Sequence, residues 1–174
     1  QLQHLEITRD IASSLNHIFP NTLIIPESRV DERVMIVPGT DGQKMSKSYN
    51  NVINIFLPDK KLRKQIMSIK TDSKGIEEKK DTKTCNVFKL YQLLANETQS
   101  KAIKAKYAAG NFGYGDAKKE LFELICIKFK KEREKFNYLM ANKDILDNEL
   151  LTGADKARVI AREVLSRVRR NIGY

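Results

Sequence analysis

Cysteine and histidine are scarce in this chain of 174 residues, which contains two of each. Cys85 and Cys126 lie far apart, so they form no Cys-x-x-Cys pair, and their spacing to the two histidines matches no zinc site. We therefore expect two buried or half-buried free thiols and no metal ligands in the protein. Free thiols are typical of a reducing compartment, so the sequence predicts an intracellular, cytoplasmic protein.

Long apolar runs are also missing, and acidic residues are outnumbered. No run approaches the roughly 18–20 residues that cross a bilayer, so we expect no membrane partner. The 32 Lys and Arg residues exceed the 22 Asp and Glu residues and give a net charge of +10. Such a surplus favours a polyanionic partner, because binding to phosphates releases counterions. The remaining composition, 41% apolar and 31% charged, is typical of a globular chain with a buried core.

The apolar pattern divides the chain at about residue 55. An amphipathic helix over residues 1–19 leads into apolar stretches at 22–26 and 34–37, which we interpret as short strands. This order is typical of the end of an α/β layer structure. Residues 56–174 predict an all-helical bundle interrupted by a charged loop at 71–84. The helices of this second part are expected at residues 59–70, 85–95, 97–109, 117–140 and 153–173.

Two of these expected helices carry long apolar stripes that should face inward, and Asp116 is expected to be the N-cap of the first of them. The stripe of the helix at 117–140 consists of Leu121, Ile125, Phe129, Phe136 and Met140. The stripe of the last helix consists of Ala157, Ile160, Ala161, Val164, Val168 and Ile172.

The loop at residues 38–51, PGTDGQKMSKSYNN, has a composition suited to binding phosphate. Two ammonium groups, on Lys44 and Lys47, could reach two oxygens of one triphosphate, and serine hydroxyls and loop amides would add donors. Gly39 and Gly42 would allow unusual backbone angles and movement. A loop that closes on phosphates as charge builds there stabilises a transition state more than a ground state. From the Lys-x-x-Lys spacing alone, an ordinary solvated surface loop remains an open alternative.

The complete string KMSKS at residues 44–48 is the signature of class I aminoacyl-tRNA synthetases. Its setting, through FLPDKKLRKQIMSIKTDS and DTKTCNVFKLYQLLA to GYGDAKKEL and GADKARVIAREVLSRVR, resembles bacterial-type tryptophanyl-tRNA synthetases over essentially the whole chain. The resemblance implies the carboxy-terminal half of an α/β parent, mostly α in this chain. Residues 1–55 would end a Rossmann-like catalytic domain, and residues 56–174 would form a helical anticodon-binding domain. The second class I signature, His-Ile-Gly-His, has no counterpart, so we expect the chain alone to form no tryptophanyl-adenylate.

The resemblance implies roles for particular residues. In this family ATP activates tryptophan to an adenylate, and the acyl group then moves to tRNA. Lys44 and Lys47 would neutralise the departing pyrophosphate, while Mg²⁺ would be held mainly by phosphates and water. Gln1 matches the glutamine that touches the amino group of the amino acid. The residues expected to bind ATP are Lys44, Met45, Ser46, Lys47, Ser48, Val34, Met35 and Ile36, the last three lying along the adenine or simply forming a core strand.

The expected partners are tRNA, ATP and tryptophan, and the resemblance implies a homodimer. Basic residues on the last helix would hold the tRNA backbone. The candidates are Arg158, Arg162, Arg169 and Arg170. Two alternatives remain: a tyrosyl-tRNA synthetase, and a non-catalytic RNA-binding module that uses only the basic helices. The second gives no reason for a complete KMSKS string.

Overall fold

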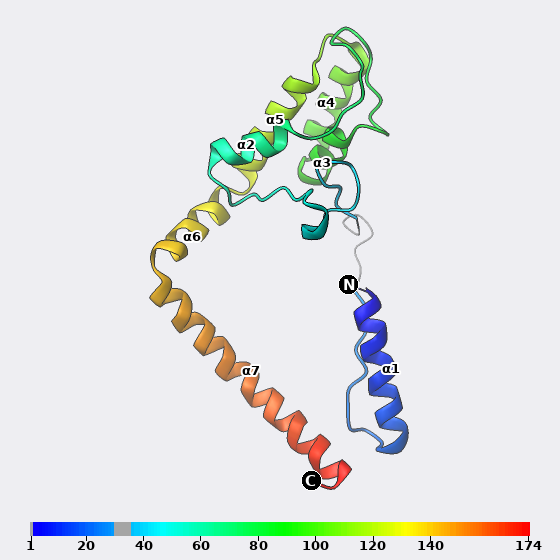
Figure 1. Ribbon diagram of the computed structural model, residues 1–174, viewed down its shortest axis with the longest axis vertical. Coiled ribbons are helices and arrows are strands. Elements are labelled where there is room, and N and C mark those ends of the chain that lie inside the picture. The colour runs from blue at the N-terminus through cyan, green and yellow to red at the C-terminus, as the bar shows by residue number, and fades with distance from the viewer. Residues whose placement is uncertain (1, 30–35) are drawn as a thin grey trace. The chain divides into compact units, whose positions relative to one another are not determined.

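The structure is a computed structural model that describes residues 2–29 and 36–174. These residues are mostly helical, which confirms the expected fold class (Figure 1). Contacts divide the chain into unit 1, Gln1–Val30 with Leu139–Tyr174, and unit 2, Asp31–Tyr138. The boundary at residue 55 is a division of another kind, between a catalytic and a tRNA-binding part, and it stays a prediction.

Unit 2 contains the helices that form the main core. In Figure 1 they lie together, with α5 packed against both α2 and α3. Apolar residues three or four positions apart explain this packing, since they share one helix face. Leu62, Ile66 and Ile69 are almost fully buried. The helices are α2 (Asp59–Met67), α3 (Asn86–Leu94), α4 (Glu97–Ala109) and α5 (Tyr114–Lys128).

Local capping sets where α4 and α5 begin. The side chain of Asn96 accepts the backbone N–H of Gln99 at 2.9 Å, and the Gln99 side chain accepts the N–H of Asn96 at 3.0 Å. This capping box satisfies two backbone donors that the first turn leaves unpaired. At α5 the N-cap is Gly113, whereas Asp116 lies inside the first turn and pairs with Lys119. The prediction that Asp116 is the N-cap is therefore wrong, although a carboxylate in the first turn still complements the helix dipole.

The single helix predicted at 117–140 is two helices, because α5 ends at Lys128 and α6 spans Lys130–Ala141. On one side of the break, Lys128 Nζ donates to the carbonyl of Leu94 at 2.5 Å. On the other, Arg133 donates to the carbonyl of Ile55 at 2.5 Å and pairs with the carboxylate of Asp59. These tertiary contacts outweigh the local helix preference around Phe129. Phe136 and Met140, which belong to the predicted inward stripe, are exposed by 37% and 49%, although the ring of Phe136 stacks on that of Phe56.

A buried lysine orders the charged loop at 71–84. Lys80 is only 6% exposed, and its ammonium donates to the carbonyls of Gly75, Ile76 and Glu78 at 2.9, 3.3 and 3.1 Å. The same ammonium lies 5.2 Å from the ring centroid of Tyr114. A buried charge is tolerated when it is fully hydrogen-bonded, as here. The loop therefore has a defined course without any helix or strand.

Unit 1 contains α1 (Leu2–Ile18) and α7 (Lys143–Ile172). The segment after α1 bonds to α7 at Thr22, whose carbonyl accepts the Arg167 Nε–H at 2.8 Å and whose hydroxyl oxygen accepts the Asn171 amide at 2.5 Å. α7 begins ten residues earlier than the predicted start at 153. None of the described residues of α7 is buried.

The predicted inward stripe of the last helix is wrong. Val164 and Val168 are half-buried and the other members are exposed, Ile160 by 66%. The spacing marks the apolar face correctly, but the described part of unit 1 packs no second helix along it.

The strand predicted at 22–26 is absent, and Ile24 is 88% exposed. Side chains of α1 satisfy backbone groups that a sheet would otherwise pair. Asn16 accepts the N–H of Leu23 at 2.8 Å and donates to its carbonyl at 2.7 Å, and Arg9 donates to the carbonyl of Pro26. The described residues include one isolated bridge, Pro38 with Lys44, and no extended strand. None of the helices in residues 2–29 and 36–174 is long and apolar enough to cross a membrane.

Candidate functional site

The loop at residues 38–51, named here the lysine loop, begins with a tight hairpin turn. The N–H of Gly39 donates to the carbonyl of Gln43 at 2.7 Å, and the N–H of Met45 donates to the carbonyl of Val37 at 2.9 Å. Gly42 has φ +87°, a conformation that favours glycine. A Cβ on Gly39 would lie 2.4 Å from Cγ of Asn51, so this glycine permits a close contact. The two glycines therefore shape the turn for different reasons.

Asn51 closes the lysine loop from inside. Its side chain is 2% exposed, accepts the N–H of Ser46 at 2.8 Å, and donates to the Asp41 carboxylate at 2.8 Å and the Lys44 carbonyl at 3.1 Å. Its own carbonyl accepts the N–H of Thr40 at 2.9 Å. The hydrogen bond from Asn51 also lowers the pKa of the Asp41 carboxyl, so this carboxylate stays ionised at neutral pH and continues to accept the hydrogen bond. One buried amide thus fixes both arms of the loop.

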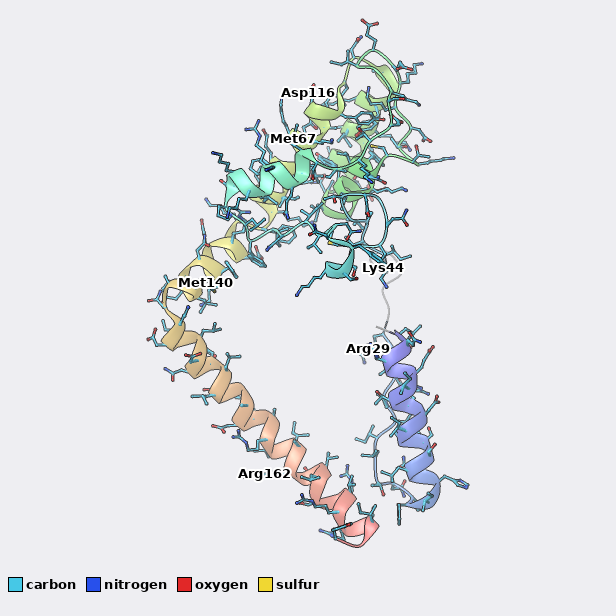
Figure 2. All side chains as sticks on the ribbon, viewed as in Figure 1. Arg29, Lys44, Met67, Asp116, Met140 and Arg162 are labelled. Carbon is cyan, nitrogen blue, oxygen red and sulfur yellow. The ribbon has the colours of Figure 1, made fainter. Side chains whose placement is uncertain are left out.

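Lys44 and Lys47 project from this fixed backbone into solvent. Lys47 begins the short 3-10 helix η2 (Lys47–Tyr49), and Asn50 ends it with φ 52° and an N–H bonded to the Lys47 carbonyl at 3.1 Å. Figure 2 shows Lys44 at an edge of unit 2. Within residues 2–29 and 36–174 neither ammonium has an ion-pair partner. Two cations of one loop are therefore free to bind an anion.

The remaining donors of the lysine loop divide into two groups. The hydroxyl oxygens of Ser46 and Ser48 lie 2.7 Å apart and can turn toward a ligand. Many backbone amides, in contrast, already donate within the chain and hold the loop in shape. A bound phosphate would thus be contacted mainly by side chains. The engaged amides are those of Gly39, Thr40, Gly42, Gln43, Met45, Ser46, Tyr49 and Asn50.

The back of the lysine loop rests on the helices of unit 2. The N–H of Lys70, just after α2, donates to the carbonyl of Thr40 at 2.7 Å. Asn86, the first residue of α3, donates its side-chain amide to the carbonyl of Lys70 at 3.2 Å. A Cβ on Gly42 would lie 2.5 Å from that amide nitrogen, so the turn packs directly on α3. The loop and the helices therefore form one packed body.

A second candidate surface is a hollow of about 730 Å³ between residues 82–83, α3 and α4, named here the basic hollow. Four lysines line it, Lys83, Lys89, Lys101 and Lys104, together with the acidic residue Glu97. The Glu97 Oε2 atom lies 3.9 Å from Lys101 Nζ, but both side chains are largely exposed, and ion pairs between exposed side chains are weak. In the part of the chain that the structure describes, the other lysines of the hollow have no ion-pair partner. The sequence analysis missed this group because its members come from three separate segments.

The other predicted site residues are placed as follows. Gln1, Val34 and Met35 lie outside the described residues, and Ile36 is 59% exposed, so it forms no core strand. The basic residues proposed for tRNA belong to α7 in unit 1, where Arg158 pairs with Asp155. The others are exposed: Arg162, labelled in Figure 2, Arg169 and Arg170.

Cys85 and Cys126 are free thiols, the first buried and the second half-buried, as the sequence predicted. Burial raises the pKa of the Cys126 thiol and so disfavours the reactive thiolate. Across the described residues, no three His, Cys, Asp or Glu side chains stand together as a metal site.

Known proteins resemble this chain along nearly all of its length. It is 46% identical over 173 residues to a tryptophan–tRNA ligase of Campylobacter jejuni, and 44% identical over 173 residues to one of Rhodopirellula baltica. Each match covers 99% of this chain and 54% of the relative. A crystal structure of tryptophanyl-tRNA synthetase from Campylobacter jejuni, complexed with ADP and tryptophan, superposes with a TM-score of 0.85 at 45% identity. That superposition covers 100% of this chain and 55% of the other.

The chain therefore spans about half the length of the curated relatives it matches. The family model described as "tRNA synthetases class I (W and Y)" matches residues 1–130, which include the whole lysine loop and most of unit 2. The chain belongs to this family of class I tRNA synthetases for tryptophan and tyrosine.

Proposed function

We propose that the chain is the carboxy-terminal part of a tryptophan–tRNA ligase, in which Lys44 and Lys47 bind the phosphates of ATP. The observation that carries this proposal is a pair of exposed ammonium groups, without an ion-pair partner among residues 2–29 and 36–174, on a loop whose backbone Asn51 holds in place. Lysine acts as a compact point charge, which suits phosphate oxygens. The names of the relatives support tryptophan rather than tyrosine as the amino acid.

In the proposed reaction the carboxylate of tryptophan attacks the α-phosphorus of ATP, and pyrophosphate leaves. Lys44 and Lys47 would neutralise the charge that builds on the departing pyrophosphate, so they act through electrostatics and positioning. Mg²⁺ would be held by phosphate and water oxygens. The activated acyl group then passes to the terminal ribose of tRNA. A cytoplasmic location and a homodimer belong to the same proposal, as do adenine contacts by residues 34–36 and an amino-acid contact by Gln1.

Protection from chemical labelling tests the ATP site in the chain itself. Lysine amines are acetylated with limiting reagent, with and without MgATP, and the modification of each lysine is measured by peptide mass spectrometry. At ATP concentrations about tenfold above the dissociation constant, labelling of Lys44 and Lys47 should fall about tenfold. Lys60 and Lys61, exposed on α2, are matched controls that should not change. AMP should give no protection, because it lacks the β- and γ-phosphates.

Equal labelling of Lys44 and Lys47 with and without saturating MgATP would contradict the ATP site. Protection of Lys60 and Lys61 to the same extent would show only a general effect of polyanions.

The basic hollow supports an RNA partner. Its volume is about 730 Å³, and three of its lysines, Lys83, Lys89 and Lys104, have no ion-pair partner among the described residues, which suits the backbone phosphates of a single-stranded RNA segment. Side chains with hydrogen-bonding groups, Gln92 and Ser100, line the same hollow and could contact base edges. We therefore propose the basic hollow, in addition to the α7 arginines, as a surface that contacts tRNA. A purely RNA-binding module would use the same surface but would leave the lysine loop without a role.

A charge-matched comparison tests the RNA surface. Three phosphate contacts on a single strand contribute about 2 to the slope of log affinity against log salt, which corresponds to about 100-fold in affinity at 0.1 M salt. The variant with Lys83→Gln, Lys89→Gln and Lys104→Gln should therefore bind a labelled tryptophan anticodon stem-loop about 100-fold more weakly. The control variant carries Lys60→Gln, Lys61→Gln and Lys64→Gln on α2, with the same loss of charge.

The control should change the affinity by less than about threefold, because distant exposed charges are screened by salt. If both variants lose affinity equally, the basic hollow is no specific contact surface. Replacing Arg162, Arg169 and Arg170 by glutamine measures the separate contribution of α7.

A further inference from the structure

Met45 lies in the second arm of the lysine loop and borders a pocket lined by helices of unit 2. It is half-buried, whereas its neighbour Lys44 is exposed, as expected when successive side chains of an extended segment point to opposite sides. Its N–H donates to the carbonyl of Val37 at 2.9 Å. The flanking groups, the Lys44 carbonyl and the Ser46 N–H, are both bound by the Asn51 side chain. The backbone around Met45 is thus held on both sides.

The side chain of Met45 lines an apolar pocket of about 180 Å³ inside unit 2. The pocket walls include Leu90 and Leu94 of α3 and Leu121 and Ile125 of α5. Every lining residue is apolar, so the pocket is unsuited to a phosphate or another charged ligand, which would lose its hydration there without compensation. The flexible thioether of Met45 forms one side of this space, and such a side chain adapts to irregular apolar surroundings.

We propose that Met45 is a positioning residue that seats the lysine loop on α3 and α5. Asn51 closes the loop internally, but it does not attach the loop to the helices. Thr40 and Gly42 join the first arm of the loop to Lys70 and to α3. Met45 borders the apolar pocket from the second arm, and in this proposal it fixes where the ammonium groups of Lys44 and Lys47 stand. The consequence for ATP rests on the proposed function, whereas the seating of the loop does not.

Hydrogen exchange in the 174-residue chain tests the seating. Met45→Ala should raise the exchange of the amides in residues 44–51 about tenfold, because the loop opens more often, and should leave the amides of α4 unchanged. Met45→Leu, which keeps the apolar contact, should restore exchange to within about twofold of the original. Met67→Ala is the matched control, because Met67 ends α2, is 40% exposed and does not line the pocket (Figure 2).

Three results would overturn the seating. Exchange of residues 44–51 could stay unchanged in Met45→Ala. It could rise together with that of α4, which would indicate a general loss of stability. It could also rise equally in Met45→Leu, so that the apolar contact would not be the cause.

A second readout separates positioning from simple packing. MgATP protection of Lys44 and Lys47 from acetylation should be lost in Met45→Ala and retained in Met45→Leu. Faster loop exchange with full protection would mean that Met45 only packs, and the positioning role would be refuted. If MgATP fails to protect the original chain, the proposed ATP site fails, while the exchange experiment still decides the seating.

Discussion

Replacing Lys47 with alanine is expected to lower the rate of adenylate formation by about 100- to 1,000-fold in a ligase of the relatives' full length that contains this chain. The reason is electrostatic. Among the described residues the ammonium of Lys47 has no ion-pair partner. It can therefore interact with the charge that develops on pyrophosphate without first breaking another ion pair. An interaction that strengthens only as this charge builds raises the rate and not merely the affinity for ATP. The measurement is the single-turnover rate of adenylate formation.

The binding constant for tryptophan, measured separately, should remain close to its original value, because the lysine loop would contact the phosphates of ATP and not tryptophan. Lys61→Ala is the matched control: it removes the same charge from an exposed position on α2. Should Lys47→Ala react at the original rate, the lysine loop would have no part in the chemistry. A loss of tryptophan affinity as large as the loss of rate would point to a misfolded site.

Replacing Asn51 with alanine is expected to lower the free energy of unfolding of unit 2 by about 1–3 kcal/mol from its two backbone hydrogen bonds alone, to the Ser46 N–H and the Lys44 carbonyl. The cost is large because Asn51 is buried, so water does not readily replace the lost partners. The link to Asp41 is lost as well. Urea denaturation followed by circular dichroism measures the change. Asn137→Ala, at an exposed position of α6, should lower stability far less.

Asn51→Asp adds a pH dependence to this result. The aspartate keeps the acceptor for the Ser46 N–H but loses the donors to Asp41 and Lys44, and it places a second carboxylate beside Asp41. In the original chain the pKa of Asp41 is lowered by Asn51, so this link stabilises the fold above the usual Asp pKa of about 3.9 and is lost as pH falls below it.

The instability of Asn51→Asp relative to the original chain should therefore be greatest near neutral pH. It should shrink below about pH 4, where a protonated carboxyl can donate. A deficit that is independent of pH would contradict the role given to the Asn51–Asp41 hydrogen bond.

The helices of unit 2 could be predicted because their sequences satisfy local and tertiary requirements together. The range 97–109 is the observed α4, where Asn96 and Gln99 form a capping box before a helix that buries Ile103 and Tyr107. Leu62, Ile66 and Ile69 follow one another at spacings of three or four residues, and they are almost fully buried. In these segments the apolar period, the caps and the neighbouring helices all favour the same structure.

The incorrect predictions concern segments whose structure depends on contacts with residues distant in the sequence. Nothing near Phe129 resembles a helix breaker, yet contacts from Lys128 and Arg133 to Leu94, Ile55 and Asp59 accompany a break there. The apolar run at 22–26 satisfied the strand pattern, but the backbone of Leu23 binds the side chain of Asn16 instead. A periodic pattern identifies an apolar face without specifying which neighbour covers it.

The candidate site was predictable to a similar extent. The KMSKS string identified the two lysines as candidates, and the glycines before it predicted unusual backbone angles, one of which Gly42 adopts with its positive φ. The role of Asn51 was not foreseen, because its bonds reach back to residues five to ten positions earlier and depend on the folded turn. The basic hollow had no linear signal, since Lys83, Lys89 and Lys104 meet only after α3 packs against α4 and the preceding loop.

The two candidate surfaces share one short element, α3. Phe88, Lys89 and Gln92 line the basic hollow, while Leu90, Leu93 and Leu94 line the pocket beneath Met45. Because α3 lines both the basic hollow and the pocket beneath Met45, a displacement of α3 would change the shape of both. If RNA in the basic hollow displaces α3, we expect Lys44 and Lys47, the proposed phosphate ligands, to move with it. By thermodynamic reciprocity ATP would then alter the affinity for RNA by the same factor that RNA alters the affinity for ATP.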